Sequence, residues 1–249
     1  MSDFLRNSIA TTNQHERTHT ATVDTRYVRL PEDTKGWLLI KLSPSHTDAF
    51  ICEYTKVTMV KSEGGRTYFK VADGLSSVGL TASLSDENAK RLLLKTPPST
   101  AVATVKVKYG ARKEEHSPFK GPLLQQWGTL NVGSQPITVT LNSRWTGEFT
   151  PIPAGVHRIM APDYSHAESS TLGYRNTHPG RIKANDVWFP IELAGTKGNS
   201  TRYVHIGHLS EGCVTVHQIE RWNDVYNFLI SHRLPNTDGK YVALLEVTK

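Results

Sequence analysis

Short runs of β-forming residues, separated by turn signals, recur along most of this chain of 249 residues. Alternation of β-branched or aromatic residues with polar ones over about four to eight positions is typical of half-buried strands, and clusters of Gly, Pro and Asn favour turns. The predicted strands lie at residues 27–30, 37–42, 49–54, 57–60, 67–71, 101–109, 136–141, 156–160, 187–193, 202–206 and 241–247. We therefore expect a mainly β fold.

Two segments depart from this pattern and predict helices. Residues 88–95 follow Ser85, whose side chain can accept a backbone N–H group at a helix start, and the Thr-Pro-Pro run after them ends the helix. Between Ile219 and Ile230 the apolar residues recur at helical spacing. This spacing predicts an amphipathic helix that packs on the sheet, with its aromatic side chains in the core.

The segment from Gly110 to Pro122 is charged and rich in turn residues, which is typical of a linker between domains. It divides the chain into a polar tail at residues 1–22, a β-rich N-terminal module of unassigned role at residues 23–112, and a catalytic domain at residues 119–249. A chain of this length can bury a core without disulfides or metals.

The formal net charge of +6 arises from 29 basic and 23 acidic residues that are spread along the chain. No basic tract, zinc-finger spacing or RNA-binding aromatic signature occurs, so nucleic acid is not an expected partner. A modest positive charge instead favours attraction to an anionic polymer such as a cell wall. No apolar run approaches the length of a membrane helix, about 18 residues, so we expect no membrane insertion.

Only two cysteines occur, and they imply no disulfide framework. Cys52 lies within an apolar strand pattern without a histidine nearby, so we expect it to be a buried core residue. Residues 205–216 read His-Ile-Gly-His-Leu-Ser-Glu-Gly-Cys-Val-Thr-Val and place Cys213 downstream of His205 and His208. An imidazole beside a cysteine can accept its proton, which makes Cys213 a candidate nucleophile.

Gly212 permits a tight turn, so the N–H groups of Gly212 and Cys213 are candidate donors to an oxyanion. Either histidine can be the base, and we favour His205 because the end of a strand holds a side chain more rigidly than the loop position of His208. A backbone carbonyl or the Ser210 hydroxyl can orient the imidazole. Three further residues are candidates for contacts with substrate carboxylates: Tyr203, Arg202 and Arg175.

The order His-x-Gly, spacer, Ser-x-Gly-Cys at the end of a β-rich segment resembles the cysteine L,D-transpeptidases, which remodel peptidoglycan. Residues 150–159, Thr-Pro-Ile-Pro-Ala-Gly-Val-His-Arg-Ile, are similar to a strand that precedes the catalytic turn in that family. The resemblance covers roughly the last half of the chain. The sequence departs from the family at Glu211, where the family has His, at Thr215, where it has Arg or Asn, and in a shortened spacer.

The resemblance implies a β-sandwich catalytic domain with a C-terminal amphipathic helix, a cysteine acyltransferase activity and no cofactor. Cys213 is then expected to attack the bond between the L-centre and the D-amino acid in a tetrapeptide stem of peptidoglycan. The outcome is transpeptidation, exchange of a D-amino acid or L,D-carboxypeptidation, depending on whether an amine or water accepts the acyl group.

No basic region followed by an apolar run stands near Met1. We therefore expect synthesis in the cytoplasm without a signal peptide, and action in the periplasm or cell wall after specialised export. This pattern favours an antibacterial effector toxin that is carried by an apparatus such as type VI secretion, with the N-terminal module as carrier contact. An immunity protein is then expected to cover the Cys213 cleft.

Two other functions stay open. Histidines surround the downstream cysteine, at His157, His166, His178, His205, His208 and His217. Imidazole with thiolate is a familiar zinc ligand set, which predicts a zinc-dependent hydrolase. The spacing of His205 and His208 on an extended chain, and the lack of Cys-x-x-Cys or His-Glu-x-x-His, argue against a metal. The second alternative is a non-catalytic binding protein. The intact nucleophile turn argues against it, because a degenerate scaffold is expected to have lost this turn.

Overall fold

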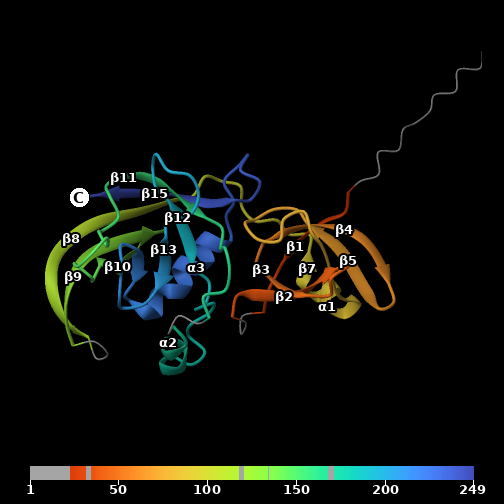
Figure 1. Cartoon of the computed structure of the whole chain (residues 1–249), viewed down its shortest axis with the longest axis horizontal. Helices are drawn as coiled ribbons and strands as arrows, with labels where there is room; N and C mark the ends of the chain where they lie inside the picture. The colour runs from red at the N-terminus through yellow and green to blue at the C-terminus, as the bar shows by residue number, and fades with distance from the viewer. Residues whose placement is uncertain (1–22, 32–34, 118–120, 134, 168–170) are drawn as a thin grey trace, which may run out of the picture.

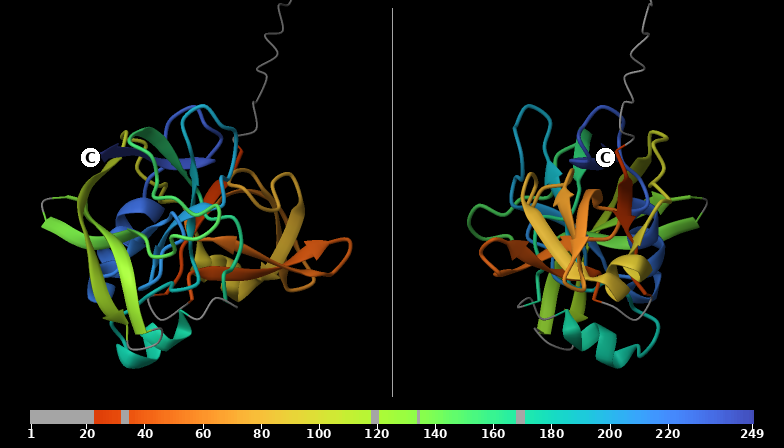
Figure 2. Two further views of the ribbon diagram at one scale, coloured as in Figure 1. Left: turned by 60° about the vertical axis from the view of Figure 1, so that its left-hand side comes forward. Right: turned by 90° about the vertical axis from the view of Figure 1, so that its right-hand side faces the viewer.

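The computed structural model describes residues 23–31, 35–117, 121–133, 135–167 and 171–249. These residues form two β sheets that lie side by side (Figure 1), and in the view turned by 90° the N-terminal sheet lies in front of the barrel (Figure 2). The predicted mainly β class is therefore confirmed. The predicted tail at residues 1–22 lies outside the described residues.

The N-terminal sheet is antiparallel, with strand order β3-β2-β6-β5-β4-β1-β7. Its strands are β1 (Thr25–Val28), β2 (Trp37–Ser43), β3 (Asp48–Cys52), β4 (Lys56–Glu63), β5 (Arg66–Val71), β6 (Thr81–Ser85) and β7 (Leu93–Leu94). The helix α1 (Asp86–Leu92) packs its Ala89 and Leu92 against the apolar face. Its start is capped as expected, because the Ser85 hydroxyl accepts a hydrogen bond from the Asn88 N–H at 3.3 Å.

The second sheet closes into a barrel of eight strands in the order β10-β14-β13-β12-β11-β15-β8-β9. Its strands are β8 (Thr104–Ser117), β9 (Gly121–Val132), β10 (Gln135–Asn142), β11 (Gly155–Met160), β12 (Phe189–Glu192), β13 (Arg202–Ile206), β14 (Val214–Val216) and β15 (Tyr241–Thr248). The family resemblance implied a sandwich, but β9 pairs with β10 and completes a ring. Closure is possible because β8 and β9 are long and curve strongly (Figure 1), with a register shift between Tyr109 and Arg112.

The segment Gly110–Pro122, expected as a linker, is instead part of the barrel. Lys113 pairs with Gln125, and the pairing of β8 with β9 continues to Ser117 opposite Gly121. Most of this segment is exposed because the paired strands extend beyond the core, which gives them the composition of a loop. The prediction of a linker here is wrong, and the two sheets divide within residues 95–103.

The helix α3 (Trp222–Ile230) follows the 3-10 turn η1 (Ile219–Arg221) and packs into the barrel core. Trp222 and Leu229 are fully buried, so the predicted amphipathic helix and its buried aromatic face are confirmed. Trp37 and Cys52 of the N-terminal sheet belong to the same core cluster. The two sheets are therefore joined by shared apolar packing, and Cys52 is a buried core residue as expected.

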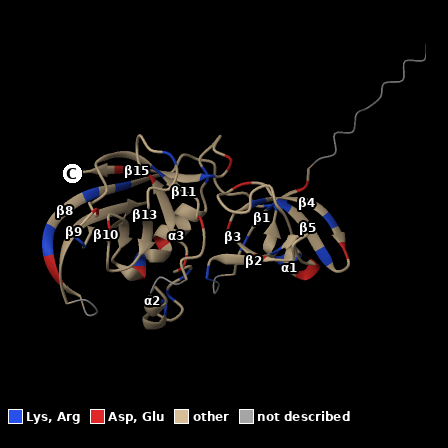
Figure 3. Cartoon of the chain, viewed as in Figure 1, with Lys and Arg blue, Asp and Glu red and all other residues tan. Residues whose placement is uncertain are grey.

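Lys and Arg as well as Asp and Glu occur on both sheets (Figure 3). The surface thus shows both signs of charge on each module, in keeping with the spread of charged residues along the sequence. Within the described ranges, no helix combines the length and the apolar character that a membrane crossing requires.

Candidate active site

Of the predicted catalytic residues, His205 lies on β13, and Cys213 directly precedes the neighbouring strand β14. β13 and β14 run parallel, with Val204 opposite Val214 and His205 opposite Thr215. The two valines are fully buried in the barrel core. Because successive side chains in a strand point to opposite faces, His205, Thr215 and Cys213 share the face that is turned away from this core.

The imidazole of His205 is held in one tautomer. Its Nδ1 lies 2.9 Å from the carbonyl oxygen of Ile206, which can only accept, so the neutral ring carries its hydrogen on Nδ1. Nε2 faces the hydroxyl of Thr215 at 3.0 Å, and the ring stacks on Trp188 with centroids 4.2 Å apart. Burial lowers the pKa of His205 to about 4. At neutral pH the ring is therefore neutral, with Nε2 as a hydrogen-bond acceptor.

The thiol of Cys213 is only 6% exposed. Burial raises the pKa of Cys213 to about 11, although the backbone N–H groups of Tyr203 and Glu211 and the charge of Arg202 act in the opposite direction. Over the described part of the chain, no hydrogen bond joins Sγ to His205. At neutral pH Cys213 is therefore a protonated thiol and His205 a neutral imidazole.

The turn before Cys213 requires a glycine. Gly212 has φ +84°, and a Cβ there would lie 2.5 Å from the carbonyl oxygen of Thr150. The Ser210 hydroxyl donates to the Cys213 carbonyl at 2.9 Å, and its N–H donates to the Ser143 hydroxyl at 2.8 Å. Ser210 thus fixes the turn, while the imidazole is oriented by a backbone carbonyl, one of the two alternatives raised by the sequence.

Residues 144–151 lie over this turn and are tied to it by two side chains. Arg202 Nη2 donates to the Thr150 hydroxyl at 3.3 Å, and Arg144 Nη1 donates to Glu211 Oε1 at 2.9 Å. The Arg144–Glu211 pair is about half exposed on both sides. Exposed ion pairs of this kind contribute about 0–1 kcal/mol, so the segment is held over the turn only weakly by this contact.

His208, the alternative base, belongs to a different group of side chains. Its Nδ1 lies 3.1 Å from Nε2 of His217, which in turn lies 2.9 Å from Oε1 of Glu115. The backbone N–H of His208 donates to the Tyr174 hydroxyl at 3.2 Å. No hydrogen bond connects either His208 or His205 with Cys213 in the described ranges, so His205 as the base stays a prediction.

The predicted substrate contacts lie in different places. Tyr203 lies on β13, where its hydroxyl donates to Asp163 Oδ2 at 3.3 Å and accepts a hydrogen bond from Asn199 at 2.7 Å. Arg175 lies on α2 (Leu172–Thr177). Burial raises the pKa of the Asp186 carboxyl, and the positive charge of Arg175 acts in the opposite direction. Arg202, in contrast, lies beside the nucleophile turn.

Sequence patterns missed a stack of rings that leads away from His205. Trp188 lies between the rings of His205 and His166, with centroids 4.2 Å and 4.4 Å away, and Tyr164 stacks on His166 at 4.3 Å. Tyr164 is 58% exposed, so the stack runs from the buried imidazole to the surface. Thr215, the partner of His205 Nε2, was missed too, because only the strand register brings it there.

A cavity of about 390 Å³ lies elsewhere, between the two sheets. Its walls include Arg29, Glu53, Tyr54, Lys183 and Tyr226. Neither Cys213 nor a histidine lines it, so it belongs to the junction of the modules and not to the proposed chemistry.

Comparisons with family models, with curated proteins and with solved structures found no match for this chain. The assignment of a function therefore rests on the residues and on the geometry described above.

Proposed function

We propose that the protein is a cysteine acyltransferase of L,D-transpeptidase type that acts on the tetrapeptide stems of peptidoglycan. One observation carries the proposal: the register of β13 on β14 turns Cys213 and His205 to one face and leaves Nε2 of His205 as an acceptor. A nucleophile and a base with a fixed tautomer are the minimum that acyl transfer requires. The sequence resemblance of residues 205–216 supplies the substrate class.

The neutral pair acts by general-base catalysis. The Thr215 hydroxyl has a second acceptor, the Leu209 carbonyl at 3.3 Å, and turning toward it frees Nε2 of His205. Nε2 then takes the thiol proton while Sγ of Cys213 forms a bond to the substrate carbonyl carbon. The imidazolium returns this proton to the leaving amine as the C–N bond breaks. An amine or water releases the acyl group from sulfur in the second half of the reaction.

Donors for the negatively charged oxygen lie at the nucleophile turn. Within the described residues, neither the N–H of Gly212 nor that of Cys213 donates to a backbone carbonyl in the turns and loops. Both N–H groups are therefore available to an oxyanion. Arg202 Nε is buried without a described hydrogen-bond partner and lies 3.1 Å from the Cβ position of Gly212. A substrate carboxylate at this point satisfies an otherwise costly buried donor. Arg202 is therefore the best supported of the three proposed carboxylate contacts.

Access to the thiol requires the segment at residues 144–151 to move. Its contacts with Glu211 and Arg202 are exposed side-chain contacts, which cost little to break. The buried Asn142 donates to the Arg144 carbonyl at 2.7 Å and Trp145 Nε1 donates to the Leu124 carbonyl at 2.6 Å, so the expected movement is in the part near Thr150. A bound stem peptide then replaces the segment as the cover of the turn and excludes water.

The proposed substrate also predicts where the protein acts and which proteins it contacts. Peptidoglycan lies outside the cytoplasmic membrane, so the protein acts in the periplasm or cell wall. We extend the proposal to an effector that an injection apparatus delivers, with the N-terminal sheet as the contact for its carrier. An immunity protein that covers the Cys213 turn completes this proposal.

The test is mass spectrometry of purified muropeptides after incubation with the protein. We expect loss or exchange of the terminal D-amino acid, or a new cross-link, with the wild-type protein. Cys213→Ala and Cys213→Ser abolish turnover because they remove the thiol nucleophile. Cys52→Ala is the matched control, since Cys52 is also a buried free cysteine and retains no role in the reaction.

The histidine variants separate the two candidate bases. His205→Gln lowers the rate by about 10² or more, the usual cost of losing a general base, while His208→Gln has a smaller effect. A greater loss for His208→Gln, with normal turnover by a variant of its neighbour, His217→Gln, reverses the assignment of the base. Wild-type turnover by both Cys213 variants, or unchanged stems with a folded wild-type protein, contradicts the proposed function.

A further inference from the structure

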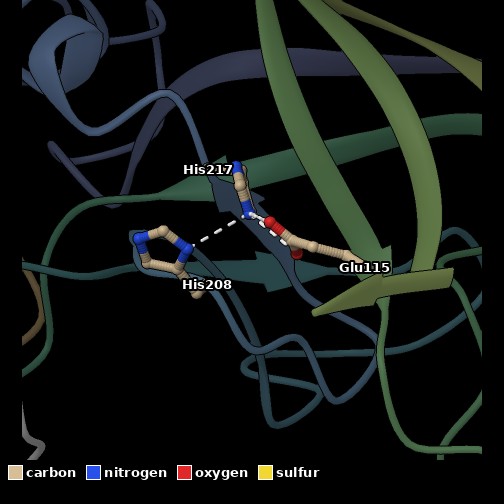
Figure 4. Close-up of side chains that lie close together, drawn as sticks. All are labelled: Glu115, His208 and His217. Atoms are coloured by element: carbon tan, nitrogen blue, oxygen red, sulfur yellow. Dashed lines mark hydrogen bonds and ion pairs between the residues drawn. The ribbon is translucent and has the colours of Figure 1, made fainter. Parts of the chain in front are cut away.

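Three side chains from separate parts of the barrel converge on one point (Figure 4). Glu115 comes from β8, His208 follows β13, and His217 follows β14. One ligand atom of each lies within 4.8 Å of the others. Nε2 of His217 lies at the centre, 3.1 Å from Nδ1 of His208 and 2.9 Å from Oε1 of Glu115.

A single proton serves these contacts poorly. Nε2 of His217 carries either one hydrogen or one lone pair, yet it faces Nδ1 of His208 and both oxygens of the Glu115 carboxylate, the second at 3.1 Å. If it carries the hydrogen, that hydrogen is shared among three acceptors. If it does not, its lone pair points at a carboxylate. A cation between the three groups removes this conflict, because all three then present lone pairs to it.

The distances fit a small divalent ion. A tetrahedral zinc ion with bonds of about 2.0–2.2 Å to nitrogen and oxygen holds its ligand atoms about 3.3 Å apart. Two separations, 3.1 and 2.9 Å, are slightly shorter than this, and all three ligand atoms lie within 4.8 Å of one another, so small shifts of the side chains admit the ion. Two imidazoles and one carboxylate are a ligand set that zinc accepts readily.

The surrounding side chains hold this arrangement in place. Gln125 is fully buried, and its Nε2 donates to Glu115 Oε2 at 3.0 Å and to the His208 carbonyl at 2.9 Å. The ring of Trp127 packs edge-on against His217, with centroids 4.7 Å apart. Hydrogen bonds of this kind fix the orientation of metal ligands and raise their affinity.

We propose that Glu115 Oε1, His208 Nδ1 and His217 Nε2 form a mononuclear site for Zn²⁺ or a divalent ion of similar size and preference. The three protein ligands leave a fourth position for water, as in zinc sites that are open to solvent. All three residues are partly exposed, which gives the ion a path from solution. The ion fastens the extended β8–β9 strands to the ends of β13 and β14.

The site is distinct from the proposed nucleophile but is linked to its turn. Gln125, which positions Glu115, accepts a hydrogen bond from the Ser143 hydroxyl, and that hydroxyl accepts one from the N–H of Ser210. Loss of the ion is therefore expected to loosen the turn before Cys213. Metal binding itself requires no thiol and does not depend on the proposed acyl transfer.

The experiment measures zinc binding by the metal-free, full-length protein. Protein stripped with a chelator is titrated with Zn²⁺ in competition with a chromophoric chelator, and bound metal is counted by mass spectrometry. We expect about one zinc ion per chain. Glu115→Gln and His217→Gln weaken binding by more than about 100-fold, because removal of a ligand exceeds the 10–100-fold cost of removing a residue that only orients one.

The neighbouring residues on β8 provide matched controls. Glu114→Gln and His116→Gln remove the same chemical groups from exposed positions on the same strand, and both are expected to bind zinc as the wild-type protein does. Cys213→Ala also retains full affinity, so failure of the cysteine mechanism and failure of the metal site give different results. Circular dichroism checks that each variant is folded.

A measurement on the wild-type protein covers the case in which a ligand variant does not fold. Among the eleven histidines, zinc is expected to shift the imidazole ¹⁵N resonances of two, His208 and His217, and to leave His205 unchanged. The proposal is overturned if the wild-type protein binds no zinc, if the ligand variants bind it as tightly as their controls, or if other histidines respond.

Discussion

Gly212→Ala tests the packing of the nucleophile turn against the segment that covers it. The substitution has two costs. An alanine at φ +84° adopts a left-handed conformation, which costs about 1–2 kcal/mol. Its Cβ would also lie 2.5 Å from the backbone oxygen of Thr150, which forces backbone to move and costs about 1–3 kcal/mol more. We expect the free energy of unfolding to fall by about 2–5 kcal/mol.

Gly147→Ala is the matched control. Gly147 lies in the covering segment with φ +80°, and a Cβ there meets no atom within 4 Å. It therefore carries the conformational cost alone, about 1–2 kcal/mol. Urea denaturation at pH 7, followed by fluorescence, measures both variants, and a difference of about 1–3 kcal/mol between them reports the contact with Thr150. Equal destabilisation by the two substitutions refutes the inference that Thr150 packs on the turn.

Three further perturbations follow from the site. Because the pKa of His205 is about 4 when folded and about 6.5 when unfolded, the unfolded state binds the extra proton between these values, and stability falls as the pH drops from about 6.5 to 4. The loss of unfolding free energy reaches about 3 kcal/mol. In urea denaturation, the unfolding free energy of His205→Gln should therefore depend less on pH than that of the wild-type protein, and an equal pH dependence would contradict the burial of a neutral ring. Ser210→Ala removes a hydroxyl that donates to the Cys213 carbonyl, and thermal unfolding should show a loss of about 1–2 kcal/mol, whereas an unchanged midpoint argues against this hydrogen bond. Expression in bacteria with an added export signal should slow growth, and Cys213→Ala should restore it; equal growth of both strains speaks against peptidoglycan as the target.

Local sequence patterns predicted the elements that local physics controls. The apolar spacing from Ile219 to Ile230 predicts one buried helix face, and α3 buries that face. The Ser85 cap depends on residues only three positions apart. Gly212 is also readable from the sequence, because a Ser-x-Gly-Cys turn with positive φ requires glycine.

The strand pairing was decided by the tertiary structure. β13 and β14 are parallel neighbours joined by only residues 207–213, whereas parallel strands commonly need a connection of about a dozen or more residues. Alternation of apolar residues shows which face of each strand is buried, but not the partner or the direction of pairing. The contact of His205 with Thr215 follows from that pairing and could not be predicted from the sequence.

The same limit applies to the β8–β9 strands and to the cluster that they complete. Their exposed residues resemble a linker in composition, because both a linker and an extended pair of strands are surrounded by water. Glu115 lies 102 positions from His217 along the chain, and only the curvature of the closed barrel brings the carboxylate to the imidazole. The sequence by itself determined the alternating pattern of buried apolar residues and the position of a cysteine after a glycine turn. The tertiary structure decided which side chains meet, because backbone pairing between distant segments has no periodic signature along the chain.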